Sequence, residues 1–130
     1  MHAVSSYDYA IIRIVPYVER GECMNVGVIL FCPTRGFLDA LISLDRQRLA
    51  ALAPQLDYEA LSSHLDAIPV ICRGGEEVGG FRHMSQSERF QWLVSPRSTM
   101  IQTSSLHSGL CTDPQVTLEH LLRTMVLLPQ

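Results

Sequence analysis

Three groups of polar residues in this 130-residue chain have the side-chain types needed to bind an anion. The first is Arg13, which stands among isoleucines and valine in AIIRIV (10–15). An unpaired charge in a protein interior is costly, so we expect this guanidinium to find an acceptor. Glu22 and Asp8 are the carboxylates we consider for that role. A structural ion pair, an edge arginine that reaches solvent and a ligand contact all remain open.

The second group lies in RGECMNVG (20–27) and contains Arg20, Glu22 and Asn25. The planar fork of Arg20 suits a carboxylate or a phosphate. Gly27, inside a strand pattern, predicts a β-bulge or the close approach of another backbone. The alternative for Asn25 is turn chemistry, in which its side chain bonds to its own backbone.

The third group lies in 95–113 and contains Arg97, Ser98, His107 and Asp113. This segment leads into a predicted helix N-terminus, where free amide groups favour an anion. Asp113 as the helix cap would repel that anion, so a plain hydroxyl-rich loop is the alternative. Ser98, His107 and Asp113 are also the residue types of a serine hydrolase, but no G-x-S-x-G nucleophile elbow accompanies them.

Together these groups suggest a small enzyme or binding domain for a phosphorylated or carboxylated ligand. Arg13, Arg20 and Arg97 would neutralise the anion, and Glu22 or His107 would move a proton. Whether the chain is an enzyme stays open. No metal site or cofactor is expected, because the four cysteines lie far apart without a CxxC pair or a histidine at ligand spacing.

Strands must position the first two groups. YDYAIIRIV (7–15) predicts a central strand that is apolar on both faces, and 24–31 and 37–42 predict the next two strands. A fourth strand is expected over 99–104. The short connections favour antiparallel pairing, because no segment between the first strands is long enough for a helical crossover.

The helical pattern begins after the third strand. Two to four helices are expected, and Asp45, Asp57, Ser85 and Asp113 are the candidate capping residues. Pro69 should kink or end the second helix, although Ile71 and Cys72 could prolong the same face. Glu88 completes a capping box in the third, and Pro114 occupies the first helical position of the last.

The order of these elements predicts an α+β fold: an antiparallel sheet of three to four strands with helices packed mainly on one face. The length predicts a single domain over 1–130, with an ordered core of about residues 7–128.

Composition narrows the possible partners. Charged residues make up 18% of the chain and the net charge is −3, so nucleic acid is a disfavoured partner and an apolar surface for another protein is favoured. The sequence contains neither a secretory leader nor an apolar run of roughly 20 residues, so we expect a cytoplasmic protein without membrane contact. The oligomeric state stays open.

The motifs YDYAIIRIVPYVERGECMNVGVIL, SPRSTMIQTS and HSGLCTDP resemble the bacterial family catalogued as domain of unknown function 3037, over Tyr7 to Val126. This resemblance brings no assigned activity. Family members are often encoded beside HipA-like kinases, so the resemblance implies an accessory protein, a companion subunit to a HipA-like kinase-fold protein. The family-like motifs include the positions Arg13, Arg20, Glu22, Asn25, Gly27, Arg97, His107, Gly109 and Asp113. An interaction protein is therefore our first functional hypothesis, and the anionic-ligand domain is the alternative.

Overall fold

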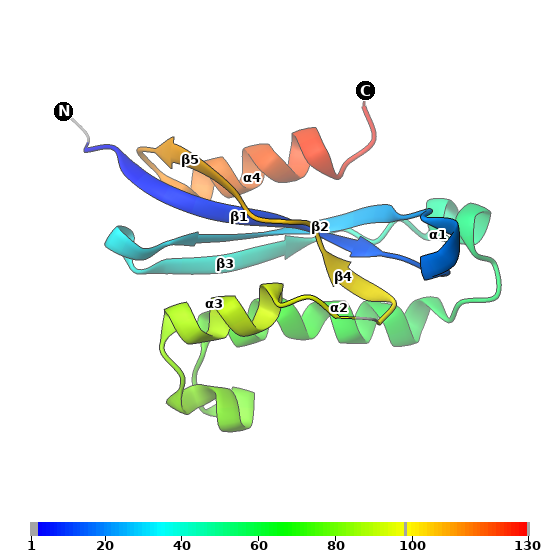
Figure 1. The fold of residues 1–130 in the computed structure, drawn as a ribbon, viewed down its shortest axis with the longest axis horizontal. Helices are drawn as coiled ribbons and strands as arrows, with labels where there is room; N and C mark the ends of the chain where they lie inside the picture. Colours follow the sequence, from blue (N-terminus) through cyan, green and yellow to red (C-terminus); the bar gives the residue numbers. More distant parts are fainter. Residues whose placement is uncertain (1–2, 98, 130) are drawn as a thin grey trace.

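One antiparallel sheet with helices on both faces forms the molecule in the computed structural model, which describes residues 3–97 and 99–129 (Figure 1). The strands are β1 (Ser5–Ile14), β2 (Met24–Cys32), β3 (Phe37–Ile42), β4 (Ile101–Thr103) and β5 (His107–Cys111). Their order is β3-β2-β1-β4, and β5 also pairs with β1. The predicted α+β class and the antiparallel sheet are confirmed.

β1 is the central strand because both of its faces are apolar. Ala10, Ile12 and Ile14 point to one core, and Ile11 points to the other. One edge of β1 pairs with β2 along most of its length. The other edge is shared by β5, which pairs with Ser5 to Tyr9, and β4, which pairs with Ile12 to Ile14.

A β-bulge interrupts the pairing of β1 with β2. Ile12 pairs with Gly27 and Arg13 pairs with Asn25, so Val26 is the extra residue. A Cβ atom on Gly27 would lie 2.7 Å from the carbonyl oxygen of Leu41 on β3. The bulge and the close backbone approach that this glycine predicts are therefore both present.

Four α-helices follow the predicted caps: α1 (Arg46–Leu52), α2 (Tyr58–Arg73), α3 (Gln86–Val94) and α4 (Pro114–Met125). In each case the predicted capping side chain accepts hydrogen bonds from backbone N–H groups of the first turn, and Ser85 with Glu88 forms the capping box. α2 continues through Pro69 and ends at Gly74. Short 3-10 turns are η1 (Val18–Arg20), η2 (Pro33–Arg35) and η3 (Glu76–His83).

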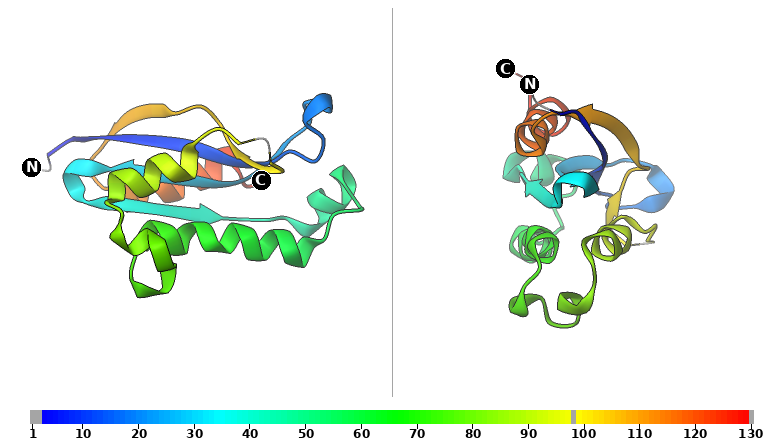
Figure 2. Two further views of the ribbon diagram at one scale, coloured as in Figure 1. Left: turned by 60° about the horizontal axis from the view of Figure 1, so that its bottom comes forward. Right: turned by 90° about the vertical axis from the view of Figure 1, so that its left-hand side faces the viewer.

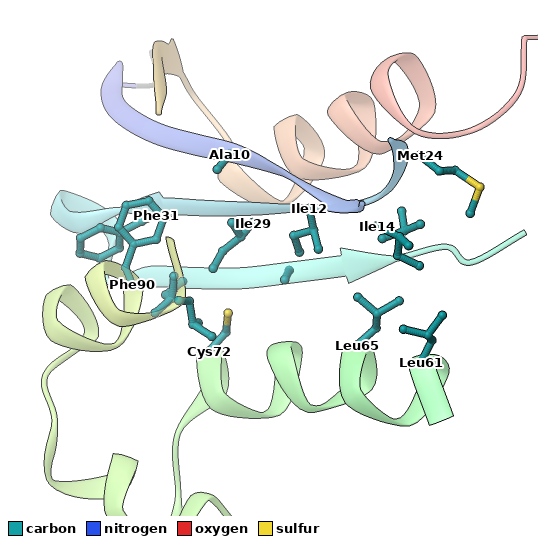
Figure 3. Close-up of a cluster of buried hydrophobic side chains, with 14 of the residues drawn as sticks. Ala10, Ile12, Ile14, Met24, Ile29, Phe31, Leu61, Leu65, Cys72 and Phe90 are labelled. Atoms are coloured by element: carbon teal, nitrogen blue, oxygen red, sulfur yellow. The ribbon is translucent and has the colours of Figure 1, made fainter. Parts of the chain in front are cut away.

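The helices form two layers around the sheet (Figures 1 and 2). α1, α2 and α3 contribute Leu49, Leu65 and Phe90 to the larger core, whose side chains fill the space between the helices and the sheet (Figure 3). α4 covers the opposite face and packs Leu118 and Leu121 against β2 and β3. Most helices thus lie on one face, as predicted, and the last helix takes the other face.

The fourth row of the sheet is a broken strand rather than the single strand expected over 99–104. β4 covers only three residues, and β5 forms from a segment that we interpreted as a hydroxyl-rich loop. Ser104 bridges the break: its Oγ accepts from Ile11 N–H at 2.9 Å, and its own N–H donates to the Ile11 carbonyl at 2.8 Å.

Candidate binding groove

Arg13 finds its acceptor on the neighbouring strand. Its Nε donates to Asn25 Oδ1 at 3.3 Å, and Asn25 Nδ2 in turn donates to the carbonyl oxygen of Met125 at 3.0 Å. Neither Glu22 nor Asp8 takes the role that the sequence suggested for it. Asn25 joins β2 to the end of α4, so these two polar side chains contribute to the packing of the last helix.

Arg20 and Glu22 form an ion pair with each other at the surface. Both side chains are exposed, so the pair contributes at most about 1 kcal/mol to stability. The pair is therefore a local contact beside η1, and nothing in it gathers the more distant arginines.

The third predicted group divides between two elements. His107 lies in β5, exposed, with its ring centroid 5.3 Å from that of Tyr9. Asp113 Oδ1 caps α4 by accepting from Gln115 N–H at 3.0 Å. Ser98 lies outside the described residues.

Arg13 and Arg97 lie on opposite faces of the sheet. Arg13 is two residues beyond Ile11 on β1, and side chains two apart share a face, which here is the face that α4 covers. Arg97 borders a groove on the face that carries α2 and α3. The structure does not bring Arg13, Arg20 and Arg97 together, and the single anion site built from them does not form.

The groove beside Arg97 is a mainly apolar concavity with a volume of about 620 Å³. Its floor is the sheet, where Ile12 and Ile101 contribute side chains. The volume lies in the range of roughly 300–1,000 Å³ that is typical of ligand sites. We therefore take this groove as the candidate functional site.

One wall of the groove is a face of α2. Ala60, His64, Ala67 and Ile71 line it at intervals of four, three and four residues, which places them on one side of the helix. The neighbouring core-facing row overlaps with it, because Leu61 lines the groove and also belongs to the larger core. Two of the four residues in the first row are alanines, and their short side chains leave the helix surface open there.

The other wall comes from the end of α3 and the segment that leads into β4. Trp92, Ser95, Arg97 and Thr99 line it. The Arg97 guanidinium carbon lies 4.0 Å from the centroid of the Trp92 ring, and Arg97 Nη2 donates to the Trp92 carbonyl at 2.6 Å. Phe81 from η3 contacts the same indole edge-on, with 4.6 Å between centroids. The indole is therefore held between η3 and the arginine.

Sequence reasoning selected Arg97 and missed the rest of this site. A signal was present: α2 carries a second row of small and apolar residues beside its core-facing row, and the chain's one tryptophan stands five residues before Arg97. Trp92 keeps 42% of its surface exposed although large aromatic side chains are usually well buried.

The described residues offer neither a metal centre nor a membrane span. They contain no cluster of three or more histidine, cysteine or acidic side chains suited to a metal ion. They also contain no helix with the length and apolar character needed to cross a bilayer.

Comparison with known proteins gives one match. No curated protein and no solved structure matches the chain at a significant level. The family model described as "Protein of unknown function (DUF3037)" matches residues 9–126, which is most of the sequence and includes β2, the groove and α4. The chain therefore belongs to the DUF3037 family.

Proposed function

We propose that this chain is an accessory protein that binds one segment of another polypeptide in the groove between α2 and the wall formed by residues 92–97 and 99–103 (the 92–103 wall). The observation that carries the proposal is the groove itself, an apolar trough that opens beside the larger core. Residues that line it on both sides are exposed, among them Ala60, Ala67, Trp92 and Thr99.

The openness of the trough favours a polypeptide over a small molecule. Sites for small ligands enclose roughly 70–90% of the ligand surface. The groove is open to solvent between its two walls, so a small molecule bound there would keep one side in contact with water. A polypeptide covers such a trough with its own backbone, so its apolar side chains become fully buried.

The shape of the α2 wall favours a helical segment. From Ala60 to Ile71 the wall rises about 17 Å, the length of three helical turns. The short side chains of Ala60 and Ala67 allow a second helix to approach closely, because the distance between packed helices depends on the side chains at the contact. An amphipathic helix laid in a groove is an established mode of peptide recognition.

The family resemblance makes a HipA-like kinase-fold protein the first partner to test, as the larger subunit that such an accessory protein would join. The test mixes the two proteins and follows co-elution on a sizing column. In the variant Ala67→Phe the aromatic ring fills the groove, and we expect at least a ten-fold loss of affinity.

Ala50→Phe is the matched control, because Ala50 is an exposed helical alanine outside the groove. It should bind as the unchanged protein does. If Ala67→Phe bound its partner as tightly as Ala50→Phe, the groove would not be the binding site.

The alternative, a domain for a small phosphorylated or carboxylated ligand, keeps one supporting observation, the position of Arg97 beside the groove. Trp92 is the chain's single tryptophan and lines the groove, so its emission reports occupancy. Titration with dodecanoate tests this alternative. A saturable shift in emission that Ala67→Phe abolishes would favour it.

A further inference from the structure

Arg97 is a pre-positioned cation beside the groove. Its guanidinium stacks on the Trp92 ring and one of its nitrogens donates to the Trp92 carbonyl. An arginine carries five N–H donors in a rigid fork. One of them is used in the hydrogen bond to the carbonyl, so the fork retains donors for an acceptor that arrives from outside.

Among the described residues, no carboxylate forms an ion pair with Arg97. The ion pairs found among the described residues are Arg20 with Glu22 and Arg46 with Glu59. The carboxylate that lines the groove belongs to Asp57, and its Oδ1 already accepts from two backbone N–H groups at the start of α2. The groove thus combines apolar walls with a guanidinium that has no carboxylate partner in the described part of the chain.

From this arrangement we infer that the groove selects an amphipathic helix that carries a glutamate or aspartate beside its apolar stripe, and that Arg97 binds that carboxylate. The inference rests on the proposed function and further specifies that the bound segment carries a negative charge. The planar fork of arginine matches a carboxylate in a bidentate geometry. The stack on Trp92 fixes the plane of the fork before the partner arrives, which reduces the ordering cost of binding.

A carboxylate fits better than a phosphorylated side chain. Phosphorylated segments carry close to two negative charges and are usually recognised by clusters of arginines. Arg97 and His64 are the basic side chains that line this groove, and His64 stands on the opposite wall.

The test begins with a display library of helical peptides and the full chain as bait. The expected selection is a set of peptides with apolar residues three and four apart and an acidic residue at one fixed position beside them. A double-mutant cycle then pairs the best peptide with its Glu→Gln form, and the protein with its Arg97→Gln variant. Each single change should weaken binding about ten-fold.

The double-mutant cycle distinguishes a direct contact between Arg97 and the peptide carboxylate from independent effects of removing the two charges. If Arg97 binds the peptide carboxylate, the Glu→Gln peptide loses nothing further against Arg97→Gln. Arg97→Lys keeps the charge but loses the planar fork, so it should restore only part of the affinity. Thermal unfolding of both variants shows whether the 92–103 wall stays folded.

Two kinds of failure have different meanings. If no peptide from the library loses binding in Ala67→Phe, the proposed function is wrong, and the inference about Arg97 is wrong as well. If it gives groove-dependent peptides without a fixed acidic residue, or if the two losses in the cycle simply add, only the inference about Arg97 is overturned.

Discussion

Gly27 lies where its neighbours leave no space for a methyl group. A Cβ atom there would approach Leu41 O to 2.7 Å and Ile42 Cδ1 to 2.8 Å. The first of these is a backbone atom of β3, which cannot turn away as a side chain can. Gly27→Ala should therefore destabilise the protein by about 2 kcal/mol through overpacking.

Chemical denaturation of Gly27→Ala measures that loss. Gly80→Ala is the control, because a Cβ atom at Gly80 meets nothing within 4 Å. Equal midpoints for the two variants would show that β3 can move away from β2, contrary to the packing described here.

The four thiols differ in their surroundings. Cys23 is exposed, whereas Cys32, Cys72 and Cys111 are buried. Burial raises the pKa of Cys72 to about 12 and also raises the pKa of Cys111. Because the thiolate is the reactive form, native protein at pH 8 should react rapidly with a thiol reagent at Cys23 alone, and unfolded protein at all four.

Mass spectrometry after brief alkylation checks the thiol prediction, with protein unfolded in guanidinium as the reference. Rapid modification of Cys72 in the native protein would contradict its place in the core. The raised pKa also has a linkage consequence. Cys72 favours the folded state below the ordinary thiol value near 9, and this contribution is lost as the pH rises toward 12.

At the scale of single residues, the sequence predicted that a residue needs a special conformation or a hydrogen-bond acceptor. It did not predict which residue supplies that acceptor. Gly27 was identifiable because a glycine inside a strand usually marks a bulge or a close backbone contact. That Arg13 needs an acceptor also followed from its apolar neighbours. Its acceptor, Asn25, was not identifiable, because the bulge at Val26 sets the register that places the two side chains opposite each other.

At the scale of elements, the broken row formed by β4 and β5 depends on Ser104. The Ile11 N–H would lack an acceptor if the Ser104 hydroxyl were removed, since β4 and β5 both stop short of it. A buried N–H left without a partner costs about 2 kcal/mol. Ser104→Ala should lower the free energy of unfolding by that amount.

Hydrogen exchange locates the effect of Ser104→Ala. The amide of Ile11 should exchange faster in the variant, while Ser105→Ala, at the adjacent exposed residue, should leave it unchanged. An unaltered Ile11 amide in Ser104→Ala would mean that the hydroxyl does not support the sheet.

The predictability of an element depended on whether its determinants are local. The helix starts were predictable because Asp45, Asp57, Ser85 and Asp113 bond to amides only two or three residues away. β5 was not predictable: its sequence contains serine and glycine, and its partner is β1, about a hundred residues earlier. The end of α2 stayed open in the sequence, because Pro69 favours a kink or a stop whereas Ile71 and Cys72 continue the apolar face; the helix extends to Arg73.

At the scale of the whole molecule, the sheet is covered unequally. α4 packs over one face of the sheet, against β2 and β3, and α1 to α3 lie on the other face (Figure 2). The groove lies on that second face, between α2 and the 92–103 wall. The apolar stripe of each helix was visible in the sequence, but a stripe does not say which face of a sheet it will cover. The sequence contains the residues of each wall, but it does not show that the two walls face each other. They lie about thirty residues apart in the chain and meet only in the folded state.

This arrangement separates two roles of the family-like motifs. Asn25 bonds to the end of α4 and Arg13 bonds to Asn25, so both contribute to folding, whereas Arg97 borders the surface that we propose for binding. Substitutions at Arg13 should therefore act on stability, and substitutions at Arg97 on affinity.

Amide chemical-shift mapping tests the central claim most directly. Isotope-labelled protein is titrated with the best selected helical peptide or with the partner. We predict that the shifted amides are those of 60–71 and 92–103, with the Trp92 indole N–H among them, and that α4 is unaffected. Shifts confined to α4 and β5, with the groove amides unchanged, would contradict the account.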